Sequence, residues 1–170
     1  MDVFLAVASK REVRGYSDRP VSDAAVRRIL EAGRIAGSSR NRQPWRFLVV
    51  ADPGVRERLA EAVFAPGNVR GAGLVVAIAV RGGGPVAFDA GRAAQNMMLA
   101  AWNEGIGSCP NGMPDPDGVA GVLGLGEDER PVIVLTFGYP ARPRDPQRRA
   151  PEEWIARADR KPFEEVVRRL

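Results

Sequence analysis

The chain has 170 residues, of which 45% are hydrophobic and 27% are charged, with a net charge of +4. These values are typical of one globular domain, predicted here to span residues 1–170, and they exclude collagen-like and wholly disordered proteins. Histidine is absent and Cys109 is the only cysteine. We therefore expect no Ser-His-Asp or Cys-His catalytic group, no intrachain disulfide and no metal site.

The chain begins without the basic and apolar segments of a secretion signal, so we expect a cytoplasmic protein. Its longest aliphatic run, Leu74 to Val80, is much shorter than the ~20 residues that a membrane-spanning helix needs. The basic charge invites a nucleic-acid hypothesis, but the arginines are spread among acidic neighbours, and a compositional bias explains them better. We expect neither a membrane nor a nucleic-acid partner, although a positive field favours a small phosphorylated ligand.

In the first half of the chain, residues 2–9 have the apolar spacing of a short helix that leads into a basic cluster. A second helix is predicted from Ser22, a suitable N-cap, to a point before Gly37. The apolar run 45–51 predicts a strand. Asp52 and the proline after it then predict a helix that continues to about residue 63.

In the second half, residues 74–80 are apolar throughout and predict a strand that is buried on both faces. Residues 88–104 predict a long helix, apolar on nearly every side, that ends at a left-handed Gly105. Such a helix belongs in a core or at a subunit interface. A short helix up to Leu123 and a third buried strand over 131–138 follow.

Beyond Pro140 the chain changes character. Residues 141–150 are rich in proline and arginine and lack periodicity, which indicates an extended connection across the surface or a partner subunit. Two short helices are predicted over 151–158 and 163–170. The order of elements indicates an α+β or irregular α/β fold, with a core over 1–140 and a tail over 141–170.

Common nucleotide-binding motifs fail on their context. Gly105-Ile106-Gly107 follows a helix rather than a strand and has Pro110 where a Rossmann fingerprint needs glycine. Neither lysine lies in a phosphate-binding loop of the Gly-Lys-Ser/Thr type. The paired carboxylates near the C-terminus are more typical of a solvated helix face than of a glycosidase.

Several segments together carry a family resemblance. The stretch from Gly37 to Phe47, which reads Gly-Ser-Ser-Arg-Asn-Arg-Gln-Pro-Trp-Arg-Phe, lies between a helix and a buried strand, and a basic segment precedes it at residues 10–16. As a purely structural alternative, the serines and asparagine form a turn and Trp45 lies in the core. The combination resembles the FMN-dependent nitroreductase family. Residues 89–109 resemble the family's central helix and the glycine cap after it. Residues 138–140 resemble its Gly-Tyr-Pro element, and residues 160–165 resemble its terminal Arg-x-Pro-Leu-x-Glu element.

The resemblance implies an α+β fold with a central mixed sheet flanked by helices, a long apolar helix at a dimer interface, and an extended C-terminal tail that completes the phosphate site. It implies FMN as cofactor, with NAD(P)H as reductant. Lys10 and Arg160 match the family's phosphate ligands, because a phosphate dianion favours cationic donors. Arg14 matches the basic residue at the pyrimidine edge, and Arg11 and Glu12 belong to the same segment.

The resemblance also implies a homodimer with shared active sites. In relatives the segment matching Gly37, Ser38, Ser39 and Asn41 comes from the other subunit, with Gln43 close by. Residues after the central helix present backbone N–H groups to flavin N5, and the matching positions are Pro110, Asn111, Gly112 and Met113. Hydride transfer takes place on the flavin, so no side chain is expected to act as a catalytic acid or base.

Three positions depart from the family pattern. Gly37 replaces a proline, Glu12 replaces a serine near the phosphate, and Ala158 lacks the charge of some relatives. The expected activity is ping-pong hydride transfer from NAD(P)H to an electron-poor acceptor such as a nitroaromatic or quinone. Alternatives are the flavin-fragmenting, dimethylbenzimidazole-forming branch, which the acidic Glu12 resembles, and a flavin- or deazaflavin-binding protein without turnover.

Overall fold

The computed structural model describes all 170 residues, which form two compact units. The sheet unit spans Arg11–Arg144, and the terminal unit combines Met1–Lys10 with Asp145–Leu170. The first ten residues thus group with the C-terminal segment. None of the helices combines the length and hydropathy required to cross a bilayer.

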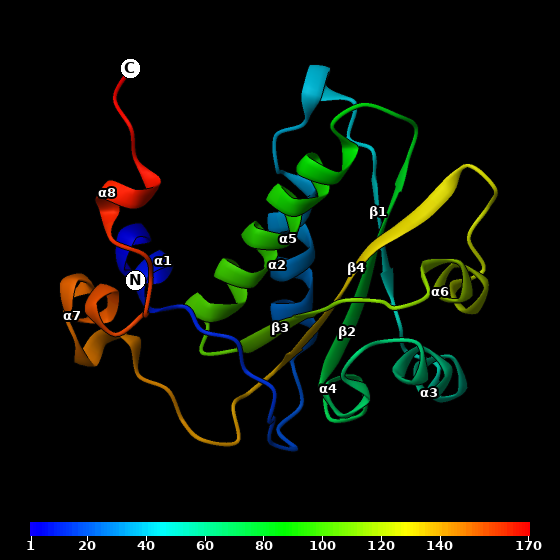
Figure 1. Ribbon diagram of the computed structural model, residues 1–170. Coiled ribbons are helices and arrows are strands. Elements are labelled where there is room, and N and C mark those ends of the chain that lie inside the picture. The colour runs from blue at the N-terminus through cyan, green and yellow to red at the C-terminus, as the bar shows by residue number, and fades with distance from the viewer. The chain divides into compact units, whose positions relative to one another are not determined.

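The sheet unit is built on four strands in the order β1-β2-β4-β3 (Figure 1). Their bounds are β1 Trp45–Val49, β2 Leu74–Arg81, β3 Gly107–Asn111 and β4 Glu129–Gly138. All strand pairs are antiparallel, and the one parallel contact is an isolated bridge between Glu12 and Ser108. The α+β class is confirmed. The sheet was predicted to mix parallel and antiparallel strands, and its only parallel pairing is that bridge.

Helices cover both faces of this sheet. Their bounds are α2 Asp23–Arg34, α3 Pro53–Glu61, α4 Pro66–Arg70, α5 Val86–Asn103 and α6 Pro116–Leu123. Helices α2 and α5 pack on one face, and α3, α4 and α6 pack on the other (Figure 1). A hydrophobic core lies on each face of the sheet, and strand β2 contributes to both. Val76 and Ile78 lie in the core beneath α2 and α5, whereas Val75 and Ala77 lie in the core beneath α3, α4 and α6. This alternation explains why an uninterrupted apolar run forms an antiparallel strand.

Local signals predicted most of these elements. Ser22 Oγ accepts from the N–H of Ala25, and Asp52 Oδ1 accepts from that of Val55, as expected of N-caps. Gly105 adopts φ 74° at the end of α5. Strand β1 ends at Val49 and α3 at Glu61, two residues earlier than predicted in each case.

The prediction missed β3 and α4. Strand β3 reads Gly-Ser-Cys-Pro-Asn, which has little β-propensity, and it holds its shape by pairing with β4 at the edge of the sheet. An edge strand tolerates Pro110, because the missing N–H can face away from the ladder. Helix α4 has only five residues, too few for a periodic pattern.

The terminal unit contains α1 Val3–Ser9, the 3-10 turn η2 Pro146–Arg148, α7 Pro151–Ala156 and α8 Phe163–Val166. Asp2 caps α1 by accepting from two backbone N–H groups, and α1 packs against α7. Trp154 Nε1 donates to the carbonyl of Pro146 at 2.9 Å. The connection over 141–150 is irregular apart from η2, as expected.

An ion-pair cluster holds the start of β4 in place. The Glu129 side chain is 1% exposed, and its carboxylate accepts from Arg46 Nη1 at 2.7 Å, Arg81 Nε at 3.1 Å and the N–H of Gly126 at 3.2 Å. The Gly126 amide, followed by the two guanidinium groups, lowers the pKa of Glu129 below its ordinary value. Its negative charge is therefore bound more favourably in the folded chain than in the unfolded one.

A pH-dependent stability follows from this cluster. Because the folded pKa of Glu129 is lowered, its contribution is complete above the ordinary value of about 4.5 and is lost as pH falls toward the folded pKa. Urea unfolding between pH 3 and pH 7 should show a steeper acid loss for the parent than for Glu129→Gln. The exposed neighbour Glu127→Gln is the control and should follow the parent; equal slopes for all three proteins would contradict the assignment.

Candidate cofactor site

The segment Glu12–Tyr16 lies against β3 and the end of β4. Val13 donates its N–H to the carbonyl of Ser108 at 2.9 Å, and the carbonyl of Gly15 accepts from the N–H of Ala141 at 3.0 Å. These backbone contacts place the side chains of Glu12 and Arg14 on the surface, where both are exposed.

Two buried glycines permit this close approach. A Cβ on Gly107 would lie 2.6 Å from Val13 Cβ, and one on Gly138 would lie 2.8 Å from Tyr16 Cδ1. Real Cβ atoms do not approach other carbons so closely, so a larger residue at either position would displace the segment. The glycine of the Gly-Tyr-Pro element thus has a direct packing role.

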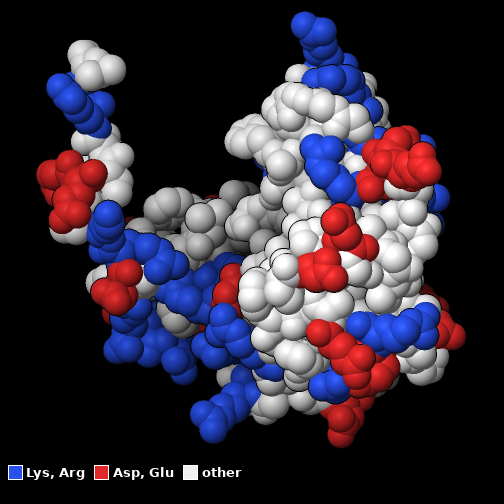
Figure 2. All heavy atoms as spheres, turned by 45° about the vertical axis from the view of Figure 1, so that its right-hand side comes forward, with Lys and Arg blue, Asp and Glu red and all other residues white.

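Beside this segment lies a hollow of about 240 Å³ within the sheet unit. Three arginines line it, Arg14, Arg142 and Arg144, together with the carboxylate of Glu12. A guanidinium offers several donors in a plane and suits phosphate or carboxylate oxygens. Elsewhere on the visible face of the sheet unit, basic and acidic side chains are interspersed (Figure 2).

A buried hydrogen-bond network joins this segment to the end of β3. Tyr16 Oη lies 2.9 Å from Thr136 Oγ1, and Thr136 Oγ1 donates to the carbonyl of Cys109 at 3.1 Å. Asn111 Nδ2 donates to Thr136 Oγ1 at 3.2 Å, and Asn111 Oδ1 accepts from Asn68 Nδ2 at 2.7 Å. The network fixes the two predicted cofactor segments relative to each other. No local sequence pattern marks Asn68 or Thr136, so neither could be predicted as part of the site.

The phenol of Tyr16 acts in this network as a neutral donor. Burial raises its pKa well above the ordinary value of 10.0 and outweighs the opposing hydrogen bond with Thr136. Because Thr136 Oγ1 uses its own hydrogen toward Cys109, the hydrogen of Tyr16 Oη is directed at Thr136, whose Oγ1 lies 2.9 Å away and whose carbonyl oxygen lies 3.2 Å away. We infer a positioning role for Tyr16 rather than proton transfer.

The network and the chemistry of proline refine the predicted flavin-N5 donors. Pro110 has no N–H to donate, so its predicted backbone contribution is wrong. Asn111 is 3% exposed as a whole residue. Its side-chain amide is hydrogen-bonded to Asn68, to the carbonyl of Cys109 and to Thr136. Gly112 and Met113 follow directly after β3 and are partly accessible.

The segment 37–43 is held against the start of α5. The N–H of Ser39 donates to both carboxylate oxygens of the buried Asp89, at 3.1 and 3.2 Å, and Ser38 Oγ accepts from the N–H of Gln43 at 2.9 Å. Arg40, Asn41 and Gln43 adopt φ of 50–54°. Non-glycine residues occupy this region at a cost, and such strain concentrates at functional sites. An acidic residue in an apolar helix was the available signal for Asp89.

The two predicted halves of the site lie at opposite ends of the sheet. Residue Trp45, which follows the segment 37–43, pairs with Val80 near the end of β2, whereas Gly138, which contacts Tyr16, ends β4 beside Gly107. Helix α5, which runs between these ends, has 18 residues and is about 27 Å long. A single chain therefore does not bring Arg14 and Asn41 together.

The remaining predicted residues belong to the terminal unit or border it. Lys10 and Arg160 lie in the terminal unit, and Arg11 begins the sheet unit. Arg160 is exposed, and its Nη1 donates to the carbonyl of Ala158 at 2.7 Å. Gly37 lies next to Arg92, whose flexible Nη2 would be 2.5 Å from a Cβ at that position.

Comparisons with known proteins agree with this architecture. The model of the family described as "Nitroreductase family" matches residues 7–83 and 69–139. The NADH dehydrogenase of Thermus thermophilus is 28% identical over 194 residues, covering 91% of this chain and 95% of that protein.

Solved structures share the fold. A "putative nitroreductase in complex with fmn" from Desulfovibrio desulfuricans is 30% identical, with a TM-score of 0.83 and coverage of 98% of this chain and 96% of that one. The nitroreductase family protein of Streptococcus pneumoniae has the same TM-score at 21% identity and covers 99% of this chain and 100% of its own. The chain therefore belongs to the nitroreductase family.

Proposed function

We propose that this protein is an FMN-dependent oxidoreductase in which NAD(P)H reduces the flavin and an electron-poor acceptor, such as a nitroaromatic or quinone, then reoxidises it. The observation that carries the proposal is the buried network between Tyr16 and Asn111. Through Thr136 it links the cationic segment 12–16, at the start of β3, to Asn111, the last residue of β3, which Gly112 and Met113 follow directly. The FMN in the related Desulfovibrio structure supports the same cofactor.

The donor set fits an anionic flavin cofactor. Arg14, Arg142 and Arg144 surround the hollow beside Glu12, and guanidinium groups suit both a phosphate and the electron-rich pyrimidine edge of a flavin. In this proposal Arg14 serves the pyrimidine edge, and Lys10, Arg11 and Arg160 serve the phosphate. Glu12 faces the same hollow and must turn toward an arginine when an anion binds.

Bound FMN supplies the hydride-accepting and hydride-donating chemistry at its N5 atom. The chain binds and orients it. The backbone N–H groups of Gly112 and Met113 are the proposed donors to N5, and the carbonyl of Gly112 is fixed by the N–H of Phe64 at 3.1 Å. A cation at Arg14 favours negative charge on the neighbouring ring and thus raises the electron affinity of the cofactor.

We further propose that the working unit is a homodimer. The segment 37–43 and the segment 12–16 lie at opposite ends of one sheet, so a complete site needs one segment from each subunit. The exposed side of α5 carries Phe88, which is 69% exposed, beside Arg92 and Gln95. The opposite side of α5 is already buried in its own chain, so this side remains for a partner.

The absorption spectrum tests the proposed function. The purified protein should be yellow, and anaerobic NADH or NADPH should bleach the flavin band, which an electron-poor acceptor then restores. A yellow protein inert to both nucleotides would instead be a flavin-binding module. A colourless protein that does not take up FMN would refute the proposal. Loss of the band in air after reduction, with formation of dimethylbenzimidazole, would indicate the flavin-fragmenting reaction.

Replacing Arg160 by alanine should weaken FMN binding by about 1.5–3 kcal/mol, because one charge-assisted phosphate contact is lost. Fluorescence titration of the apoprotein measures the dissociation constant. Arg168→Ala is the matched control, since Arg168 is an exposed arginine of the same unit, and it should bind as the parent does. Identical constants for Arg160→Ala and the parent would remove Arg160 from the phosphate site.

A further inference from the structure

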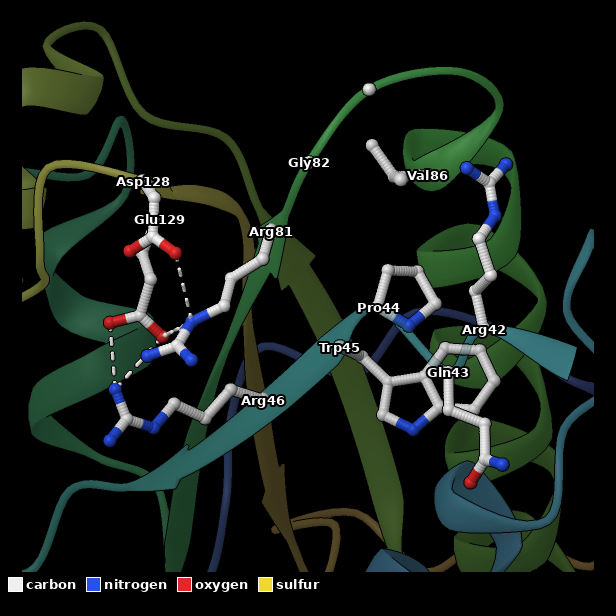
Figure 3. A pocket seen from close by; sticks show the side chains of 11 residues that line it. Arg42, Gln43, Pro44, Trp45, Arg46, Arg81, Gly82, Val86, Asp128 and Glu129 are labelled. Atoms are coloured by element: carbon white, nitrogen blue, oxygen red, sulfur yellow. Dashed lines mark hydrogen bonds and ion pairs between the residues drawn. The ribbon is translucent and has the colours of Figure 1, made fainter.

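A second, larger cavity of about 670 Å³ opens in the sheet unit at the end opposite the arginine hollow. It lies where β1 and β4 begin and β2 ends (Figure 3). This volume is within the range of ~300–1,000 Å³ that small-molecule sites occupy. The residues that matter for its chemistry are Arg42, Trp45, Arg46, Arg81, Asp128 and Glu129.

One wall consists of two arginines held in place by Glu129. The carboxylate oxygens of Glu129 already accept from Arg46 Nη1, Arg81 Nε and Gly126 N–H. A guanidinium has five N–H donors, so each arginine keeps donors beyond those that Glu129 uses. The side chains of Arg46 and Arg81 are 55% and 58% exposed. This wall therefore offers pre-positioned donors to an oxyanion.

The facing wall carries Arg42, which makes no ion pair and has one long hydrogen bond, from Nε to the carbonyl of Ser39 at 3.4 Å. In Figure 3 Arg42 stands across the cavity from the Arg46, Arg81 and Glu129 group. The lining thus has three cations against two carboxylates, Glu129 and the exposed Asp128. The excess positive charge lies on Arg42.

Between the two walls lie flat and apolar surfaces. Pro44 and the ring of Trp45 occupy the space between Arg46 and Arg42 in Figure 3. Trp45 is partly exposed, and its ring is nearly parallel to that of Phe47, with 6.3 Å between the ring centroids. Both rings pack against the core, which holds Trp45 in this orientation. An aromatic face beside guanidinium groups is the combination that recognises a flat heterocycle linked to phosphates.

We propose that this cavity binds the adenosine-phosphate portion of the nicotinamide dinucleotide, with Arg42 as the principal phosphate contact. The inference rests on the proposed function, which requires NAD(P)H. Gln43 also lines the cavity and belongs to the segment 37–43 that is proposed to reach the partner's flavin. A dinucleotide held here is therefore continuous with the reducing site across the subunit boundary.

Calorimetric titration of FMN-loaded protein with ADP-ribose and 2′-phospho-ADP-ribose tests the proposed nucleotide site. Neither probe can reduce flavin, so the titration measures binding alone. In protein kept saturated with FMN, Arg42→Ala should raise the dissociation constant for 2′-phospho-ADP-ribose and the KM for NADPH by about tenfold and should change kcat much less. Asp128→Asn should lower the dissociation constant for 2′-phospho-ADP-ribose and the KM for NADPH about twofold to threefold, because it removes a negative charge that repels the phosphates. Arg58→Ala, at an exposed arginine of α3 outside the cavity, should change neither.

The outcomes separate the two proposals. If NAD(P)H reduces the flavin in every variant but Arg42→Ala leaves both nucleotide constants unchanged, the nucleotide site is refuted and the proposed function stands. If inorganic phosphate binds in an Arg42-dependent way and the ADP-ribose probes do not bind, the cavity is only an anion site and the inference fails. If the probes bind through Arg42 but NAD(P)H never reduces the flavin, the proposed function fails and the nucleotide site stands.

Discussion

The Thr136→Val variant is expected to unfold with a free energy about 2–4 kcal/mol below that of the parent. Valine keeps the shape of threonine but removes the hydroxyl that accepts from Tyr16 and Asn111 and donates to the carbonyl of Cys109. Thr136 is fully buried, so water cannot replace these bonds. Urea unfolding monitored by tryptophan fluorescence measures the loss.

The same substitution should weaken FMN binding, because Thr136 links the segment 12–16 to the end of β3. Thr136→Ser retains the hydroxyl and is the matched control; it should bind FMN like the parent and lose only the packing of one methyl group, about 1 kcal/mol. Tyr16→Phe should show a smaller loss of stability, because a single donor disappears. Equal stability of the valine and serine variants would show that the network is not what fixes these segments.

Mixing two inactive variants, Arg14→Ala and Asn41→Asp, is expected to restore activity to about a quarter of the parent level after co-refolding. If each site takes Arg14 from one subunit and Asn41 from the other, a heterodimer carries both lesions in one site and leaves its second site intact. About half of the dimers formed by random mixing are heterodimers. The placement of these residues at opposite ends of the sheet is the structural reason for the expectation.

The control pairs Asn41→Asp with Ser39→Asp, two lesions in the segment 37–43. Their heterodimers carry one lesion in each site, so mixing should restore nothing. Inactive heterodimers from the Arg14 and Asn41 pair, with subunit exchange verified by mass spectrometry, would contradict the shared site. A monomeric mass by light scattering of the FMN-loaded protein would contradict it as well.

The helices and inner strands could be predicted because their signals are local. Ser22 and Asp52 start helices through their own side chains, and Gly105 ends one through its left-handed backbone. Residues 74–80 are apolar because both faces of β2 are covered. In contrast, Gly-Ser-Cys-Pro-Asn is a strand only because β4 lies beside it, and no local pattern contains that partner.

The same division applies to the candidate site. The basic segment 10–16, the segment 37–43 and Arg160 were recognisable by residue type and order. The partners that hold them were not: Thr136 lies 120 residues from Tyr16 and Asn111 lies 43 from Asn68. Side chains that meet only after folding leave no periodicity in the sequence.

Side-chain chemistry and short-range spacing were therefore enough to predict the family and the main helices and strands, and to nominate candidate cofactor residues. Only long-range pairing places Glu12 and Arg14 near the start of β3 and Asn41 at the opposite end of the sheet. It alone also formed the cavity between Arg42 and Glu129. These features depend on the antiparallel order β1-β2-β4-β3, which long-range backbone pairing fixes and local propensity does not encode.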